Sequence, residues 1–524
     1  MTTPVLQLDT PVLIVGGGLA GLSAAMFLAR QGIRPLLAER HPSTSVHPRA
    51  RGQNPVVMEA LRAAGVADQI MAAGPAGPNA LHIVIAESLT GQVYREIIGG
   101  EAPDFSEFSP APYGMASQER AEPILADRAR ALGADLRFGT VAEDISQDGA
   151  GVQAVLLDRA SGDRVRIRAQ YLIGADGGRS GVRSAAGIGV HGRGVLGTHL
   201  SVVFEADLAA VLGQRGFALY HLPDSTFVMT DDPGRYNLVI SVEPGDEPTG
   251  EQLKERVRRA VGRADLDVAI LDTMQFQSAV QIADRFSAGR VHLVGDAAHL
   301  MPPTGGQGGN LAVMDSYSLA WKLAAVLRGE AADGLLASHD AERRPFDEQV
   351  VEQQYAQLIL RTAPQHADGS EAEPIDPATL LFGARFPAGA IAREPDDDGA
   401  AFEDPRVPTG RPGSRAPHLR LSADDRELST ADLFGAGFVL LAGADGRAWQ
   451  AAATGRKDLA FQQIGGTGSL ADVDDAWSER YGVTARGAVL VRPDGLIAWR
   501  SFDLGRQADP AGLVTAALAR VRCH

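Results

Sequence analysis

Glycines near the start of the chain are spaced as in a phosphate-binding turn. Residues 16–21 read GGGLAG, which fits the pattern G-x-G-x-x-G. The first glycine permits a tight turn, the second lets a pyrophosphate approach the backbone, and the third permits close packing of a helix on a strand. A helix that begins here also points its positive end at the phosphates. The residues predicted to contact a dinucleotide are Gly16, Gly18, Leu19, Ala20 and Gly21.

An acidic residue follows at the distance that such a site requires. Glu39 lies 23 positions after Gly16, at the end of the next apolar run. A carboxylate there accepts hydrogen bonds from the ribose hydroxyls and repels a 2′-phosphate, so the site favours FAD or NAD over NADP. The adjacent Arg40 is included among the predicted cofactor contacts. The alternative interpretation is a tight turn that binds no ligand.

Two later motifs distinguish FAD from NAD. Residues 174–183 read GADGGRSGVR and residues 295–310 read GDAAHLMPPTGGQGGN, each after an apolar run. Ligands bind at the carboxyl ends of such strands, and bare glycine backbone can lie against a flat ring. A plain NAD dehydrogenase leaves both motifs unexplained. The residues predicted to contact FAD here are Asp176, Gly295, Asp296, Pro303, Gly306, Gly308, Gly309 and Asn310.

Asp296 and Asn310 have distinct predicted roles in the second of these motifs. A carboxylate at position 296 can hold a polyol hydroxyl. Asn310 is predicted to cap the long helix that follows, whose positive end favours an anionic flavin ring.

The elements that position these motifs are predicted from apolar periodicity. Residues 11–15 and 33–38 read as buried strands, and residues 22–31 read as a helix that Gly32 ends. This βαβ unit and the apolar runs at 168–177 and 289–298 indicate a parallel sheet. The alternating strands between them predict an inserted antiparallel sheet.

The predicted domains follow from this pattern. Pro, Asp and Gly dominate after about residue 363, which indicates a linker before a last unit with two strands. The FAD-binding domain is predicted in two parts, 1–184 and 276–362, and the second part includes a long helix. The substrate-binding middle domain is predicted at 185–275, and an excursion near 76–104 of the first part joins it. The linker is predicted at 363–414 and the C-terminal domain at 415–524.

Composition excludes several classes of protein. The 524 residues carry a net charge of −16, which disfavours nucleic acid and anionic membranes as partners. Cys523 is the only cysteine, so an internal disulfide, a CxxC pair and a zinc–cysteine site are excluded, and no metal site is predicted. Residues 11–29 carry no charge, but four glycines argue against a membrane span. The start of the sequence lacks a basic signal-peptide region, which favours the cytoplasm.

With these motifs in place, the sequence resembles the class A FAD-dependent aromatic hydroxylases, in the branch that acts on anthracycline and angucycline polyketides. The resemblance spans about residues 10–360 and also rests on HPRARGQNPVVMEALRAAGV at 47–66 and SQERAEPIL at 117–125. The last domain resembles the thioredoxin-like domain of that branch, which has no active cysteines.

The resemblance implies an α/β fold with a Rossmann-like FAD-binding domain, an inserted antiparallel-sheet substrate domain and a C-terminal thioredoxin-like domain. It implies FAD with NADPH or NADH as cofactors, and O2 activation as a flavin C4a-hydroperoxide. The implied substrate is a polycyclic aromatic molecule, and the implied assembly is a monomer or homodimer. Baeyer–Villiger insertion or epoxidation on the same scaffold remains an alternative, as does a non-enzymatic flavoprotein.

The resemblance also implies roles for single residues. Arg49 lies near the pyrophosphate or the incoming nicotinamide nucleotide, and Gln118 contacts the ribityl–phosphate region. Asp176 serves both nucleotides, and Asp296 holds the ribityl chain. Each has a plainer alternative: a solvated arginine for Arg49, a helix start for Gln118, and a stabilised turn for Asp176.

The catalytic candidates are two residues. Arg361 matches an arginine that the family places at the substrate, against the alternative of a salt bridge on a helix surface. Tyr220 substitutes for a family tyrosine that aligns near Ala218 or Leu219, or is a structural residue of the sheet. Another charged group, formed by residues 340 and 342–344, is predicted to be a solvated helix face.

Overall fold

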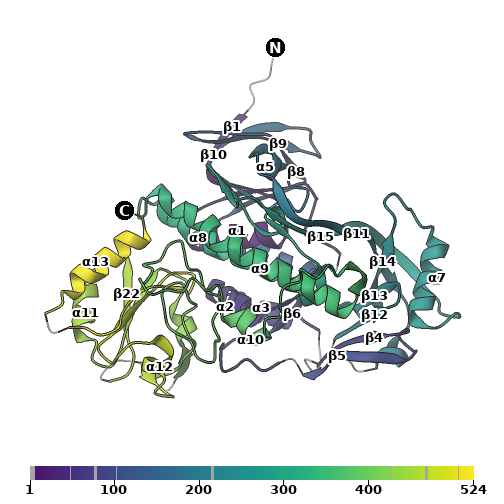
Figure 1. Cartoon of the computed structure of the whole chain (residues 1–524). Helices are drawn as coiled ribbons and strands as arrows, with labels where there is room; N and C mark the ends of the chain where they lie inside the picture. Colours follow the sequence, from purple (N-terminus) through teal and green to yellow (C-terminus); the bar gives the residue numbers. More distant parts are fainter. Residues whose placement is uncertain are drawn as a thin grey trace, which may run out of the picture.

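The protein is described by a computed structural model. It covers residues 6–47, 49–75, 80–101, 103–213, 217–424, 426–466, 470–505 and 507–523. Residues 76–79 and 102, which belong to the predicted excursion, lie outside the described residues. Residues 1–5 of the predicted FAD-binding domain and residue 524 of the predicted C-terminal domain also lie outside them. Two long helices, α8 (Gln307–Leu327) and α9 (Ala337–Arg361), lie at the centre of the molecule (Figure 1). A mainly parallel sheet, a large antiparallel sheet and a C-terminal domain surround these central helices (Figure 1).

The first sheet has the central strand order β16-β17-β10-β1-β2-β7. Strand β1 pairs in parallel with β10 and β2, and β2 pairs in parallel with β7. Both faces of β1 are buried, as parallel sheets require: Val12 and Ile14 pack in one core, and Leu13 and Val15 in the other. The strands are β1 (Leu6–Val15), β2 (Leu36–Glu39), β7 (Asp135–Phe138), β8 (Thr140–Asp148), β9 (Gly151–Asp158), β10 (Arg164–Gly174), β16 (Ser287–Ala288) and β17 (Val291–Leu293).

Helices cover this sheet, and α1, α4, α5 and α8 begin in or directly after segments that were predicted to bind FAD. The uncharged stretch at 11–29 forms part of β1 and most of α1. Among the described residues, no helix combines the length and apolar character needed to cross a bilayer. The helices are α1 (Leu19–Arg30), α2 (Pro55–Ala64), α3 (Ala67–Ala72), α4 (Gln118–Ala131), α5 (Gly181–Ala185), α8 (Gln307–Leu327) and α9 (Ala337–Arg361).

The second sheet has the order β18-β15-β11-β14-β13-β12-β4-β5. Its neighbours pair antiparallel except β12 and β4, which run parallel. Helix α7 (Gly250–Val261) covers its outer face (Figure 1). The strands are β4 (Ala80–Ala86), β5 (Val93–Glu101), β11 (Val190–Glu205), β12 (Phe217–Leu222), β13 (Ser225–Met229), β14 (Arg235–Val242), β15 (Ala269–Ala283) and β18 (His299–Leu300). The predicted inserted antiparallel sheet is confirmed.

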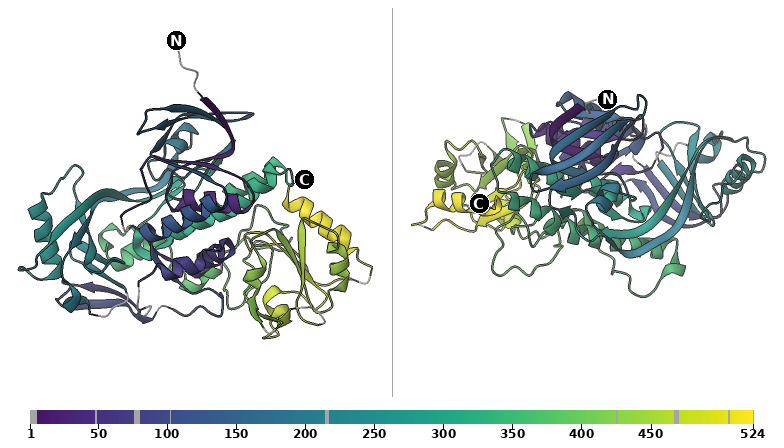
Figure 2. Two further views of the ribbon diagram at one scale, coloured as in Figure 1. Left: turned by 180° about the vertical axis from the view of Figure 1, so that it is seen from behind. Right: turned by 90° about the horizontal axis from the view of Figure 1, so that it is seen from above.

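The C-terminal domain contains a four-stranded sheet with helices beside it (Figure 2). Strand β21 pairs in parallel with β22 and antiparallel with β24, and β25 completes the sheet. This mixed sheet agrees with the predicted thioredoxin-like domain, and the predicted fold class is confirmed. The elements are β19 (Arg420–Ala423), β20 (Arg426–Ser429), β21 (Phe438–Ala442), α11 (Arg447–Ala453), β22 (Leu459–Gln463), β23 (Ala471–Asp472), α12 (Trp477–Tyr481), β24 (Ala488–Val491), β25 (Ile497–Ser501) and α13 (Pro510–Val521).

The segment 363–414, predicted as a linker, packs against the protein along much of its length. It contains α10 (Pro377–Phe382), and Phe386 packs with Phe346 of α9. Phe382 joins a small core with Phe108. The segment therefore closes the space between the central helices and the C-terminal domain.

Two members of the charged group on α9, Glu342 and Arg343, are buried, which corrects the sequence-based expectation of a solvated face, whereas Asp340 and Arg344 are partly exposed. Glu342 is buried and accepts hydrogen bonds from Lys322 Nζ at 2.6 Å and from Arg492 Nη1 at 2.7 Å. Arg492 also binds Asp494 at 2.6 Å. Arg343 is buried in a second cluster. The expectation was wrong because Glu342 packs against Lys322 of α8 and Arg492 of the C-terminal domain, and Arg343 packs against Asp315 of α8.

Candidate functional site

The glycine turn between β1 and α1 has the geometry that a bound phosphate needs. Gly16 has φ +107°, and a Cβ at Gly21 would lie 1.9 Å from the Gly16 carbonyl oxygen. Gly18 is different, because the nearest atom to an added Cβ is Glu122 Oε1 at 3.7 Å. Gly18 is also the N-cap of α1 and provides no side-chain hydrogen bond. The first N–H groups of α1, including that of Leu19, are thus left for a phosphate, so the turn fits the predicted nucleotide.

Glu39 stands beside this turn, as its spacing predicted. Its buried carboxylate accepts a hydrogen bond from the Gly17 N–H at 2.5 Å, and its other oxygen lies 2.5 Å from His41 Nδ1. Arg40 has an exposed side chain, and its carbonyl accepts a hydrogen bond from Arg159. The structure therefore brings Glu39 to the turn and leaves Arg40 at the surface.

Asp176 binds mainly to its own turn. One carboxylate oxygen accepts the Val182 N–H at 3.0 Å, and the other accepts the Ser180 hydroxyl. A Cβ at Gly16 would lie 2.2 Å from the Ala175 carbonyl oxygen. The turn thus packs against the glycine turn, and its own hydrogen bonds account for Asp176 without a ligand.

Asp296 projects from a short, tightly held segment. Residues Gly295–Ala297 form a 3-10 turn in which Gly295 and Ala297 are buried and Asp296 is exposed. Desolvation raises the pKa of its carboxyl group, and the positive charges of His299 and Arg49 oppose that shift. Arg49 is exposed and reaches Met274 of β15, so it spans the space between the two sheets.

A cavity brings together residues from several of the predicted segments. It is lined by Leu19, Gln118, Gly309 and Asn310. Gln53 also lines it, and the Gln53 side-chain oxygen has no hydrogen-bond partner in the described structure. Such an unpaired buried oxygen fits a ligand that donates hydrogen bonds.

Asn310 does not cap α8, which corrects that prediction. The helix begins at Gln307, and Gly306, with φ +66°, is its N-cap. Asn310 lies in the first turn, where its amide donates to the Gly306 carbonyl at 2.7 Å and its oxygen accepts the Asn54 N–H at 2.9 Å. The helix starts earlier because the left-handed Gly306 turns the chain into it. Asn310 therefore fastens the 303–310 loop to the start of α2.

Glu122 was not recognised from the sequence. It is buried on α4, four residues after Gln118, and accepts a hydrogen bond from the Gln118 amide at 2.6 Å. Its other oxygen accepts the Ser45 N–H at 2.7 Å. Burial raises the pKa of its carboxyl group, and these hydrogen bonds oppose the shift. The spacing of four residues on a helix was the available indication.

The inner face of the antiparallel sheet is opposite α7. The outer face packs in one core with Leu253 and Val257 of α7, and it includes Tyr220, Phe227 and Leu238. Because side chains alternate along a strand, the other residues point inward toward the FAD-binding domain. The Arg51 guanidinium lies 4.9 Å from the Phe217 ring, which places the first domain against this face. The inward residues of the central strands are Phe217, Leu219, His221, Thr226, Val228, Asn237 and Val239.

Known families match both parts of the chain. The model of the FAD binding domain matches residues 9–354, and that of the aromatic-ring hydroxylase C-terminal domain matches residues 409–521. The chain belongs to the FAD-dependent aromatic-ring hydroxylases. The expected resemblance is therefore confirmed.

Proteins of similar sequence and structure match this chain along nearly its whole length. Aklavinone 12-hydroxylase RdmE from Streptomyces purpurascens is 41% identical over 98% of this chain and 99% of its own. A 4-methyl-5-nitrocatechol 5-monooxygenase from Burkholderia is 38% identical over 99% of this chain and 98% of its own. The ternary complex of aklavinone-11 hydroxylase with FAD and aklavinone superimposes with a TM-score of 0.91 at 40% identity, covering 98% of this chain and 99% of that one.

The two catalytic candidates of this hydroxylase lie in different surroundings. Tyr220 belongs to the outer face and packs edge-on against Phe227 in the core beneath α7. Arg361 ends α9 and donates to the Thr304 carbonyl at 2.7 Å, within the 303–310 loop. Its charge also acts on His221 of the inner face. Of the two candidates, only Arg361 contacts the 303–310 loop and acts electrostatically on the inner face.

His221 is the inward neighbour of Tyr220. Desolvation, with the positive charges of Arg361 and Arg95, lowers the pKa of His221 to about 4. The imidazole is therefore neutral near pH 7 and can donate or accept a hydrogen bond. The alternation of side chains along β12 was visible in the sequence. Which set of side chains faces the FAD-binding domain depends on the position of α7, which covers the other face.

Proposed function

We propose that this protein hydroxylates a polycyclic aromatic polyketide in antibiotic biosynthesis, as an FAD-dependent monooxygenase that uses NADPH or NADH. One observation carries the proposal: the end of α9 links the two parts of the site, because Arg361 donates to the Thr304 carbonyl of the 303–310 loop and the neighbouring Leu360 carbonyl accepts a hydrogen bond from Arg95 of β5 in the antiparallel sheet. Proteins of similar sequence include named polyketide hydroxylases along nearly the full chain.

In this proposal the cofactor is held by the residues of the glycine turn and the loops. The α1 N-terminus at Gly18 binds the pyrophosphate, Glu39 binds the ribose, and Gln118 and Asp296 bind the chain between phosphate and ring. The bare backbone of the 303–310 loop lies against the ring. Bound FAD, reduced by NAD(P)H, supplies the activation of O2. The protein has to orient the substrate and exclude water.

Arg361 and His221 are proposed to orient a phenol of the substrate. Neutral His221 accepts the hydroxyl proton in a hydrogen bond, and the Arg361 cation favours the electron-rich phenolate. Tyr220 is left out of this role because it packs beneath α7.

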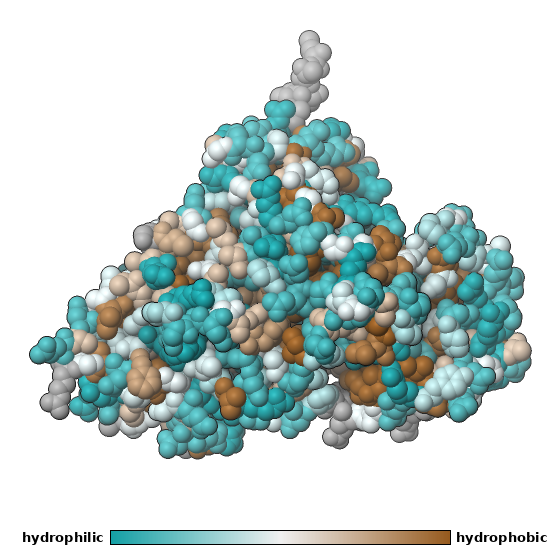
Figure 3. Space-filling model, in the orientation of Figure 1, coloured by the Kyte–Doolittle hydropathy of each residue, from teal (hydrophilic) through white to brown (hydrophobic). Residues whose placement is uncertain are grey.

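Apolar side chains gather where a flat substrate would approach this region. Leu360 at the end of α9 and Val93 and Tyr94 of β5 have exposed side chains, and Arg95 of β5 reaches the Leu360 carbonyl. Hydrophobic side chains gather on the surface around the end of α9 (Figure 3). An exposed apolar patch often marks a binding site. We further propose that the protein works in the cytoplasm, where NAD(P)H is available, as a monomer or homodimer.

Replacing Arg361 with methionine is expected to lower kcat/KM tenfold to a hundredfold. A hydrogen bond to a charged group contributes about 1.5–3 kcal/mol, which corresponds to that range. Steady-state oxidation of NADPH with a hydroxylated anthraquinone as the substrate measures it. Arg95→Met is the matched control, because Arg95 also acts on His221 but is exposed, and it should change kcat/KM less than threefold. Equal effects of the two variants would contradict a role for Arg361 at the substrate.

The function is tested on the purified protein. It should be yellow, and an anthracycline or angucycline intermediate should accelerate its oxidation of NADPH or NADH. A yellow protein that never oxidises either nucleotide would instead be the non-enzymatic flavoprotein, and a colourless protein that takes up no FAD would contradict the whole assignment.

A further inference from the structure

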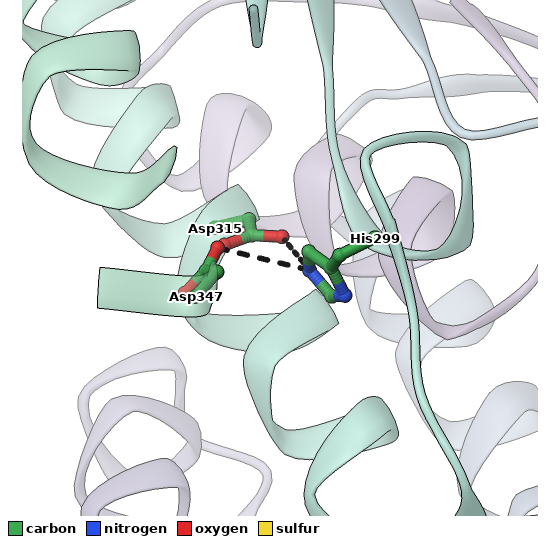
Figure 4. Close-up of side chains that lie close together, drawn as sticks. All are labelled: His299, Asp315 and Asp347. Atoms are coloured by element: carbon green, nitrogen blue, oxygen red, sulfur yellow. Dashed lines mark hydrogen bonds and ion pairs between the residues drawn. The ribbon is translucent and has the colours of Figure 1, made fainter. Parts of the chain in front are cut away.

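A buried ionic cluster lies directly behind the segment that presents Asp296. It contains His299, Asp315 and Asp347, which point toward one another from β18, α8 and α9 (Figure 4). Arg343 completes the cluster from α9. The four residues come from sequence segments that surround the FAD motif, but only His299 is part of it.

Asp315 is the residue that connects the cluster to the backbone of the motif. Its Oδ2 accepts the Gly295 N–H at 3.0 Å and the His299 Nε2–H at 2.9 Å. Its Oδ1 accepts the Arg343 Nε–H at 2.8 Å. One carboxylate therefore ties both ends of the 295–299 segment, and Asp296 projects from between the two ties.

Asp347 belongs to the same cluster without touching that segment's backbone. Its Oδ1 accepts Arg343 Nη2–H at 2.7 Å, and its Oδ2 has no hydrogen-bond partner in the described structure. Its Oδ2 is 3.7 Å from His299 Nε2, beyond a hydrogen bond. The two aspartates are equally buried, but they differ in their contact with Gly295 and in charge, because burial and the neighbouring Asp315 carboxylate raise the pKa of Asp347.

The charges in the cluster favour a structural tie over a metal site. Arg343 already provides a cation to both carboxylates, so a metal ion would be repelled by the guanidinium and would compete with it. Arg343 and His299 hold the pKa of the Asp315 carboxyl group well below its usual range despite burial. Asp315 therefore remains an ionised acceptor for the Gly295 N–H, and charge-assisted hydrogen bonds of this kind are strong.

We propose that Asp315 is a positioning residue for FAD, which acts through Asp296 by fixing the 295–299 segment. The inference rests on the proposed contact between Asp296 and the cofactor. Gly295, with φ +60°, begins a 3-10 turn that has no side-chain cap. Arg183 Nη1 donates to the Ala297 carbonyl at 2.9 Å and holds the far side of the turn, so Asp315 is the side chain that fixes its start at Gly295. Without the Asp315 tie, Gly295 is no longer held, and the start of the turn that carries Asp296 loses its fixed position.

The test compares Asp315→Asn with Asp347→Asn in the full chain. Asparagine keeps the shape of the side chain, but its single oxygen cannot serve Gly295, His299 and Arg343 together. Titration of the apoprotein with FAD should show a Kd raised at least thirtyfold for Asp315→Asn and less than threefold for Asp347→Asn. The visible absorption band of the bound flavin should shift only in Asp315→Asn. Equal effects of the two substitutions would mean that the cluster only stabilises the fold, which would overturn the inference.

A double substitution separates positioning from general stability. If Asp315 acts through Asp296, Asp315→Asn should weaken FAD binding less than threefold further in an Asp296→Ala background. Full additivity would overturn the inference. If Asp315→Asn does not fold, His299→Leu tests the same tie from its other end, because leucine cannot donate to Asp315, and it should weaken FAD binding. His299→Gln keeps a donor and should bind FAD as the unaltered protein does. Weakened FAD binding in His299→Gln would also overturn the inference. An unaltered protein that binds no FAD would contradict the proposed function instead.

Discussion

A Gly18→Val variant is expected to purify as a folded but colourless protein. Gly18 has φ −82° and ψ −169°, an extended conformation that valine adopts readily. The space around an added Cβ is open except for Glu122 Oε1 at 3.7 Å, so the fold tolerates the side chain. The isopropyl group then occupies the place of the pyrophosphate. The Kd for FAD should rise at least a hundredfold, or about 2.7 kcal/mol, measured by fluorescence titration of the apoprotein.

Gly21→Val is the contrasting variant at the same turn. A Cβ at Gly21 would lie 1.9 Å from the Gly16 carbonyl oxygen, so helix and strand must separate. We expect this variant to unfold at a markedly lower temperature, whereas Gly18→Val keeps the melting temperature of the unaltered apoprotein. Retention of FAD by Gly18→Val would show that the pyrophosphate lies elsewhere.

The second large effect is expected on stability, from Glu342→Ala. Glu342 accepts hydrogen bonds from Lys322 and Arg492, and all three side chains are buried between the central helices and the C-terminal domain. Removing one partner from a buried ion pair leaves uncompensated charge and costs about 3–5 kcal/mol. Urea unfolding should show this loss, and limited proteolysis should release the C-terminal domain first. Glu348→Ala on the same helix is the control, because its pairings with Arg344 and His191 are partly exposed, and it should cost less than about 1 kcal/mol.

The same carboxylate predicts a pH dependence. Arg492 and Lys322 lower the pKa of Glu342 to about 2 despite burial. A group whose pKa is lower in the folded state stabilises the fold above its ordinary pKa near 4.5, and this contribution is lost as pH falls from about 4.5 to 2. The stability of the unaltered protein should therefore fall more steeply over this range than that of Glu342→Ala. Parallel curves would contradict the ionised state of Glu342.

The sequence was sufficient to predict the turns that depend on a few neighbouring residues. The spacing of Gly16, Gly18 and Gly21 describes local backbone geometry, so the turn is where it was expected. The antiparallel sheet followed in the same way from alternation along single strands. Its partners β4 and β5 come from a segment more than a hundred residues earlier than β12, and their order in the sheet was not visible in the sequence.

Residues whose roles depend on distant partners were missed. Charges at 342 and 343 look solvated in one helix, and only packing on α8 and the C-terminal domain buries them. Tyr220 and His221 are neighbours, and the position of α7 decides which of them faces the FAD-binding domain. Asp315 accepts a hydrogen bond from the Gly295 N–H, which is 20 residues away in the sequence. A motif of neighbouring residues does not predict a contact at that separation.

The most direct test of the central claim is oxygen labelling of the product. The protein is incubated under ¹⁸O₂ with NADPH and an anthracycline or angucycline intermediate, and the product is analysed by mass spectrometry and NMR. Hydroxylation between the flavin loop and the inner face of the sheet predicts one ¹⁸O atom in a new phenolic hydroxyl on an intact ring. A ring-expanded lactone or an epoxide that carries the label would contradict hydroxylation, and a product without ¹⁸O would contradict a monooxygenase.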